Sequence, residues 1–106
     1  MTTRAPRQFR DVFYEILSGT ATVSPGAIAA NTTFTTNITV LGAVLGDVVF
    51  AVQASLLQGA VHLQGEVIAA DTVQLKIANT TAGAITPTAS TVYTVLVGKV
   101  NTLLNN

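Results

Sequence analysis

Alternation of apolar and polar residues is the main pattern of this chain, and it predicts β-strands. In residues 60–69 the apolar positions are Val61, Leu63, Val67 and Ala69, and the polar ones between them are His62, Gln64 and Glu66. Residues 72–78 repeat the pattern, with Val73, Leu75 and Ile77 set against Gln74 and Lys76. A period of two is typical of a strand with one buried face. Because only Ala70 and Asp71 separate the two segments, the pattern predicts a hairpin.

Four further segments read as strands. Residues 47–52 and 91–97 are mainly apolar, which is typical of strands covered on both faces. Residues 31–40 are rich in β-branched side chains, and we expect residues 18–24 to pair with them across the Pro25-Gly26 break. Turn-forming residues recur between the segments: Pro25, Gly26, Gly42, Gly46, Gly59, Asn79, Gly83 and Pro87. We therefore expect an all-β fold, a small antiparallel β-sandwich or barrel of six or seven strands, as a single domain over residues 18–106.

Residues 1–17 differ in composition and are predicted to form an N-terminal arm. They hold three of the five basic residues of the chain and three of its six aromatic residues. Apolar residues recur at helical spacing, with Gly19 placed as a stop: Phe9, Val12, Phe13, Ile16 and Leu17. Residues 12–17 fit an extended strand equally well, so an extended arm and a short helical arm both remain open.

The arm supplies the candidate partner-binding residues, which are Arg4, Arg7, Phe9, Arg10, Phe13 and Tyr14. Guanidinium groups bind carboxylates and backbone oxygens, and a run of aromatic side chains is rarely left in water. Two alternatives stay open: a solvated tail, or aromatic residues that dock on their own domain. A role in binding nucleic acid is weaker, because Asp11 and Glu15 follow at once.

The charge content changes the picture more than the length does. The chain has 106 residues, with five basic and five acidic side chains and no net charge. Only 9% of its residues are charged, against about 25% in a typical protein. Neutrality removes the electrostatic case for nucleic acid or an anionic membrane as partner. Such a chain must cover itself with Thr, Asn, Gln and Ala, or with other subunits.

No apolar run approaches the length of about 20 residues that a membrane-spanning helix needs. The first ten residues are polar and basic, unlike a secretory signal. We therefore expect a soluble protein that is made in the cytoplasm.

Candidate chemistry is sparse. His62 is the only histidine and the chain has no cysteine, so a metal or hydrolase site would have to start from His62 with Glu66 on one strand face. The chain lacks a Gly-x-Ser-x-Gly elbow, and Gly42-x-x-x-Gly46 lacks the Gly-Lys-Ser/Thr ending of a phosphate loop. We interpret the His62 face as a solvent-facing polar stripe. The sequence predicts no enzymatic activity, metal, cofactor or small-molecule substrate.

Three segments together resemble a β-module of tailed-phage virion proteins: LGAVLGDVV at 41–49, VHLQGEV at 61–67 and ADTVQLKIANTT at 70–81. The pattern is a Gly-Ala-x-x-Gly-Asp turn, an alternating hairpin, an Asn-x-Thr turn, an apolar segment and a last strand. The resemblance covers roughly residues 18–98. It implies tight turns at Gly42 and Gly46 and side-chain-capped turns at Asp47 and Asn79. It implies no catalytic residue.

The resemblance implies a structural role in the virion. Such modules occur in small capsid decoration (cement) proteins and in tail, baseplate or fibre components. A single β-domain is too short for a fibre and fits a small protein that sits on a lattice. We therefore expect a decoration protein on the capsid surface that binds the major capsid protein as a homotrimer and stabilises the shell.

The alternative is a knob on a tail, baseplate or fibre that binds a host glycan. Sugar stacking would need exposed aromatic rings, and outside the arm only Phe34, Phe50 and Tyr93 are aromatic. We expect Phe50 and Tyr93 in the core, since both lie in apolar runs.

Overall fold

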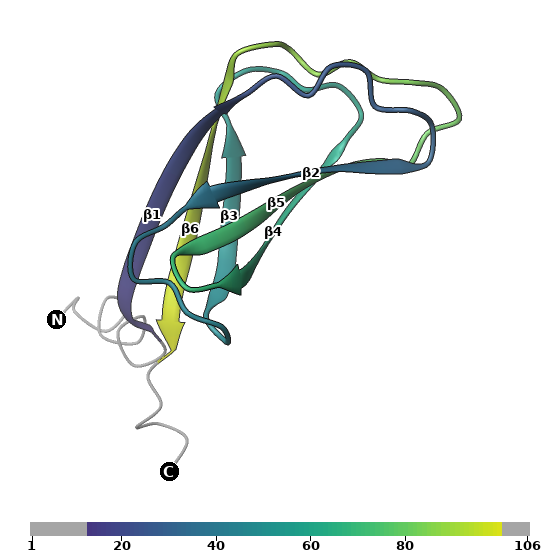
Figure 1. The fold of residues 1–106 in the computed structure, drawn as a ribbon. Coiled ribbons are helices and arrows are strands. Elements are labelled where there is room, and N and C mark those ends of the chain that lie inside the picture. Colours follow the sequence, from purple (N-terminus) through teal and green to yellow (C-terminus); the bar gives the residue numbers. More distant parts are fainter. Residues whose placement is uncertain (1–12, 101–106) are drawn as a thin grey trace, which may run out of the picture.

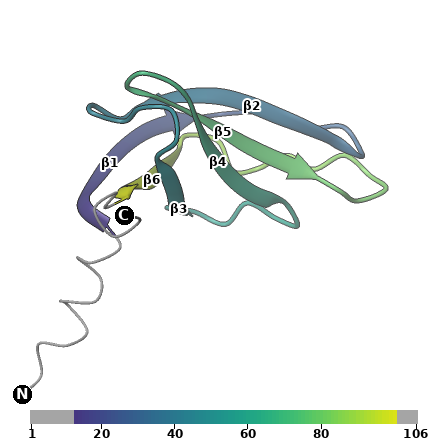
Figure 2. The same ribbon diagram turned by 90° about the horizontal axis from the view of Figure 1, so that it is seen from below.

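The computed structural model describes residues 13–100, and the side chains of residues 15–99 within them. Six strands follow one another along this part of the chain: β1 (Phe13–Val23), β2 (Thr32–Thr39), β3 (Val48–Ala54), β4 (His62–Ala69), β5 (Thr72–Asn79) and β6 (Thr91–Val100). They form two three-stranded antiparallel sheets, in the orders β1-β6-β3 and β2-β5-β4 (Figure 1). The sheets face each other as in a β-sandwich, with β2 and β5 above β6 and β3 in the view of Figure 2. The predicted all-β fold of six or seven strands is confirmed.

The predicted β4–β5 hairpin is present, with Ala70 and Asp71 as its two-residue connection. Asp71 has a φ of 59°, a conformation that Asp tolerates better than most residues because its short side chain can hydrogen-bond locally. Here its carboxylate accepts a hydrogen bond from the backbone of the β2–β3 loop, residues 40–47. The hairpin turn is thereby tied to a second loop.

The expected pairing of residues 18–24 with residues 31–40 is wrong. β1 pairs with β6, from Phe13 opposite Val100 to Val23 opposite Thr91, and β2 pairs with β5 in the other sheet. The connector between β1 and β2 carries the chain from one sheet to the other. Ile28 in this connector forms a β-bridge to Ile85, in which each backbone N–H donates to the other residue's carbonyl.

The structure also answers the question of helix or strand at the end of the arm. β1 begins at Phe13, so residues 13–17 are strand, and they pair with the last residues of β6. Residues 1–12 lie outside the described part. In residues 13–100 there is no helix that could cross a membrane.

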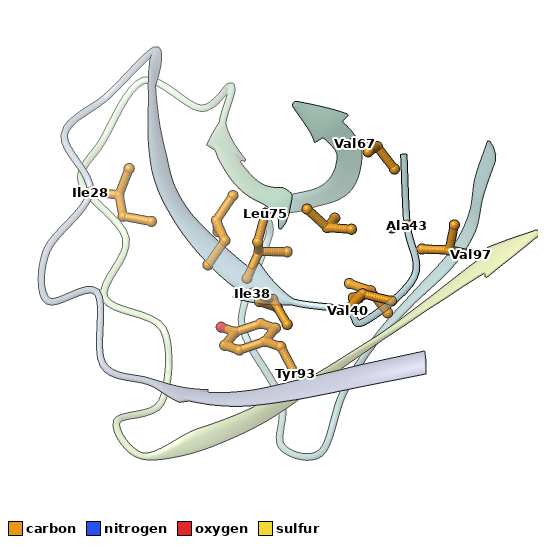
Figure 3. Packing of buried hydrophobic residues seen from close by; sticks show 11 residues of the cluster. Ile28, Ile38, Val40, Ala43, Val67, Leu75, Tyr93 and Val97 are labelled. Atoms are coloured by element: carbon orange, nitrogen blue, oxygen red, sulfur yellow. The ribbon is translucent and has the colours of Figure 1, made fainter. Parts of the chain in front are cut away.

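The core lies between the two sheets (Figure 3). Val73, Leu75 and Ile77 of β5 are fully buried, as the alternation predicts, and they face the equally buried Tyr93, Val95 and Val97 of β6. For β4 the predicted inward face is correct as far as Val67, which is buried. Ala69 is exposed, because a bulge between Val67 and Ala69 shifts the register.

The expectation of strands covered on both faces is wrong. Val48 and Phe50 of β3 are each 40% exposed, and Val92 of β6 is 38% exposed. Within residues 13–100 each sheet has only one neighbouring layer, so these residues leave the outer face of the β1-β6-β3 sheet uncovered. Tyr93 is a core residue as predicted, whereas Phe50 is not.

Candidate interaction surface

Most of the predicted arm residues cannot be placed. Arg4, Arg7, Phe9 and Arg10 lie outside the described residues. Phe13 and Tyr14 open β1, where the backbone of Phe13 pairs with Val100, but their side chains are not among those described. Within residues 15–99, a functional surface has to be sought on the domain itself.

The polar stripe of His62, Gln64 and Glu66 lies exposed on the outer face of the β2-β5-β4 sheet. Lys76 Nζ on the neighbouring strand donates to Glu66 Oε1 at 2.9 Å. Among the described residues no three His, Cys, Asp or Glu side chains come together in a group that could hold a metal ion. The exposure of these three side chains agrees with the predicted solvent-facing stripe.

The outer face of the β1-β6-β3 sheet is different, because it carries no charge between residues 15 and 99. Residues opposite one another in adjacent antiparallel strands share a face. The register therefore builds three uncharged rows across the sheet: Ile16, Gly98 and Val48; Ser18, Leu96 and Ala51; Thr20, Thr94 and Gln53. The two outer faces of the sandwich thus differ in character, one polar with charges and the other neutral.

Exposed apolar side chains are concentrated in one stretch of chain. Of the ten large hydrophobic residues exposed among those described, seven lie within residues 41–57: Leu41, Val44, Leu45, Val48, Phe50, Leu56 and Leu57. We call residues 41–57 the apolar segment. It consists of the β2–β3 loop, the edge strand β3 and the start of the β3–β4 loop, so it follows one edge of the sandwich (Figure 1).

Two aspartates hold the backbone of the β2–β3 loop. Asp71 Oδ1 accepts from Gly42 N at 2.8 Å, and Asp47 Oδ2 accepts from Val44 N at 2.9 Å. Gly42 and Gly46 have φ values of +93° and +96°, a region that side chains with a Cβ rarely adopt. The tight turns and the Asp47 cap that the resemblance implied are therefore present.

Lys99 and Ala43 complete the loop. Lys99 Nζ donates to Asp47 Oδ2 at 2.7 Å and to the Gly42 carbonyl at 3.1 Å. Ala43 is fully buried, and its carbonyl accepts from Asp71 N at 2.8 Å. On this fixed backbone Leu41 and Leu45 remain 74% and 69% exposed.

A buried polar cluster holds the start of the β3–β4 loop at the other end of β3. Gln58 Nε2 donates to the carbonyls of Leu56 and Leu57 at 2.8 and 3.0 Å, and to Thr91 Oγ1 at 3.0 Å. Its Oε1 accepts from the Tyr93 hydroxyl. Burial raises the pKa of Tyr93 above its usual value of 10.0, which extends into the alkaline range the pH interval over which this hydroxyl stays a donor. The Leu57 side chain is 90% exposed, while the backbone carbonyl of the same residue is held by Gln58.

No protein-family model, curated protein or solved structure matches this chain.

The apolar segment is suited to binding. It contains no His, Cys, Lys or Arg, and its one charged residue, Asp47, is paired with Lys99 at 2.7 Å. The seven exposed apolar side chains lie along one edge of the sandwich, and exposed apolar surface gathered in one region marks interaction sites in soluble proteins. Loops that are already ordered lose little conformational entropy when they bind. Burial of these leucines against a partner would therefore be offset only slightly by ordering of the loops.

This surface was not predicted from the sequence. Its signal was present, because Leu41, Val44 and Leu45 stand beside or between two turn glycines and Leu57 lies two residues before Gly59. Residues at turn positions lie outside the strands, so the alternation that places apolar strand residues in the core does not apply to them. Such residues are candidates for exposure.

Proposed function

We propose that this chain is a non-enzymatic structural protein of a phage virion. In this proposal it is a capsid decoration protein, made in the host cytoplasm, that binds the major capsid protein as a homotrimer and stabilises the shell. The observation that carries the proposal is the apolar segment, an uncharged surface displayed on hydrogen-bonded loops. A small domain with such a surface is built to be covered by other subunits.

Stabilisation of the shell follows from mass action. A protein that binds the assembled shell, and not its dissociated subunits, lowers the free energy of the assembled state by an amount that grows with its concentration. Several contacts made by one oligomer raise the effective affinity further, because each bound copy holds its neighbours close to their own sites. No catalytic group is needed for this activity.

The N-terminal arm, residues 1–17, is the second contact in this proposal. Arg4, Arg7, Phe9, Arg10, Phe13 and Tyr14 would lie on coat subunits, with guanidinium groups on carboxylates or carbonyl oxygens. β1 starts at Phe13, so a truncation that tests this contact has to stop at residue 12. Removal of residues 13–17 would also delete strand pairs to β6, among them Leu17 opposite Val97.

The test is co-sedimentation with empty shells assembled from the major capsid protein of the same phage. The full chain should pellet with the shells and raise their melting temperature. The variant that lacks residues 1–12 should bind at least about tenfold more weakly, a loss of roughly 1.4 kcal/mol, with its own melting temperature unchanged.

A matched control is Lys76→Gln, which removes a charge from the outer face of the β2-β5-β4 sheet. This variant should bind the shells as the full chain does. Failure of the full chain to pellet with the shells would contradict the proposal.

A knob on a tail, baseplate or fibre that binds a host glycan is the second candidate. One observation favours it: the outer face of the β2-β5-β4 sheet is lined with exposed hydrogen-bonding side chains, including Thr35, Asn37 and Gln64. Such groups can bind sugar hydroxyls. Binding to a glycan array that Asn37→Ala abolishes, together with no binding to shells, would decide for this candidate.

A further inference from the structure

We propose that the apolar segment, residues 41–57, is covered by a second copy of this chain. The inference names the surface behind the homo-oligomer of the proposed function, and it rests on that oligomer alone and not on the shell. Three properties of the segment favour a second copy of the chain as the partner: its exposed apolar area, its charge and the bulge in its edge strand.

The exposed apolar area is of the size that one interface requires. The exposed fractions of the seven large side chains together equal about four fully exposed residues, each of which removes roughly 60–120 Å² from water when it is buried. The segment therefore offers on the order of 250–500 Å² of apolar side-chain surface. A stable interface buries about 800 Å² on each partner, of which a little over half is apolar.

The charge pattern fits a partner that is identical. Close to the symmetry axis of a homo-oligomer a residue meets its own counterpart, so an unpaired charge there would meet a charge of the same sign. The only charged residue of the segment is Asp47, and Lys99 neutralises it within the same chain. Both members of this pair are largely buried, with side chains 10% and 15% exposed.

The edge strand favours a closed assembly over an open fibre. β3 ends the β1-β6-β3 sheet, and its register is interrupted by a bulge between Val49 and Ala51. Bulges at sheet edges oppose continued strand addition. We infer contact through side chains of the two loops and of β3, with a fixed number of copies.

Among the described residues, the opposite side of the sandwich offers no such surface. Glu66 and Lys76 form an exposed ion pair on the outer face of the β2-β5-β4 sheet, and Thr35 and Gln64 lie beside it. Covering that face would require the burial of charged and polar groups. It serves as the control surface.

The experiment measures molar mass by light scattering over a range of concentrations. The full chain should form a closed oligomer whose mass does not change with concentration in the micromolar range. Leu45→Lys and Leu57→Lys each place a charge in the contact and should weaken association about a hundredfold, the effect of an unpaired charge buried in an interface. Thr35→Lys, the matched control, should leave the mass unchanged.

Both leucines are exposed, so the variants should keep the melting temperature of the monomeric domain. Measurement of that temperature separates lost association from lost folding. A full chain that stays monomeric at every concentration would overturn the inference, and so would an oligomer that neither lysine variant weakens.

Shell binding, measured separately, distinguishes this inference from the proposed function. An oligomer broken by Leu45→Lys that never binds shells would support the inference and reject the decoration role. A monomer that binds shells, and loses that binding in Leu45→Lys and Leu57→Lys, would assign the segment to the coat and overturn the inference. A monomer that begins to associate when residues 1–12 are removed would assign the segment to the protein's own N-terminal residues, which also overturns it.

Discussion

At the scale of single residues, Leu75 shows how this fold is stabilised. It projects from the central strand of one sheet toward Tyr93 of the other and is fully buried (Figure 3). Leu75→Ala removes three carbons and leaves a cavity between layers that cannot collapse freely. The free energy of unfolding should fall by about 2–5 kcal/mol, measured by urea denaturation. Gln64→Ala, on the exposed face, should change it by less than about 0.5 kcal/mol, and an equally small effect at Leu75 would mean that the strand faces are inverted.

Tyr93 gives the fold a specific response to alkaline pH. Its pKa is raised by burial in the folded state, while in the unfolded chain it ionises near pH 10. Above that pH the unfolded state holds fewer protons than the folded state, so the free energy of unfolding falls as the pH rises from about 10 toward the raised pKa. Below about pH 9 both states keep the proton and this contribution is constant.

Tyr93→Phe removes both the hydrogen bond of this side chain to Gln58 and its ionisation at alkaline pH, and the two effects appear at different pH values. Near pH 7 it should cost about 1–3 kcal/mol, because Gln58 Oε1 loses its donor in a buried position. Between about pH 9 and 11 its stability should fall less steeply than that of the unsubstituted chain. Urea denaturation across this range measures the difference, to which Tyr14, present in both proteins, contributes equally. Parallel curves would show that Tyr93 ionises equally well in the folded state.

The sequence predicts well whether a residue is buried where alternation runs along a strand that has one buried and one exposed face. Val73, Leu75 and Ile77 are buried as expected, because one step along a strand moves a side chain to the other face. Asp47 and Asn79 accept hydrogen bonds from the backbones of Val44 and Thr81, as capped turns require. The exposure of the loop leucines was not predicted, since no periodicity directs a side chain in an irregular loop.

At the scale of elements, Gly19 marks where β1 passes against the chain of the opposite sheet. A Cβ at this position would overlap the Thr39 carbonyl oxygen and approach Val40 Cγ2 to 2.7 Å. Because the first neighbour is backbone, the sheets would have to separate. Gly19→Ala should therefore lower the free energy of unfolding by about 1–3 kcal/mol or more.

Gly83→Ala is the matched control, because a Cβ there meets nothing within 4 Å. It should be neutral or slightly stabilising, through the reduced freedom of the unfolded chain. The same denaturation experiment measures both variants. Equal stability of the two would mean that the close approach of β1 to the β2 end is absent in solution.

Strand pairing was predictable only where the connection is short. Two residues between β4 and β5 leave an antiparallel hairpin as the economical geometry, and that prediction is confirmed. Eight residues between β1 and β2 allow either a hairpin or a crossing to the other sheet, and alternation in the strands is the same in both cases. The true partner of β1 is β6, about seventy residues away, which no local pattern indicates.

At the scale of the whole molecule, the candidate surface arises from features that only the fold brings together. Leu41 and Leu57 lie sixteen positions apart in the sequence, at opposite ends of one edge strand. The backbones around them are held by distant residues, Asp71 and Lys99 on one side and Thr88 on the other. The low charge is a property of the composition alone, whereas the position of the exposed apolar surface depends on which strand forms the sheet edge.

The response of the assembly to salt follows from the neutral contact. Screening weakens attraction between exposed charges over a Debye length of about 10 Å at 0.1 M ionic strength, and it does not weaken contacts between apolar side chains. If the apolar segment holds the copies together, the dissociation constant of the oligomer should stay within about twofold between roughly 20 and 500 mM sodium chloride. Sodium sulfate should tighten association, because excluded salts favour the burial of apolar surface. Sedimentation equilibrium at each salt concentration measures these constants, and a tenfold weakening in sodium chloride would point to a contact made by charged residues outside the apolar segment.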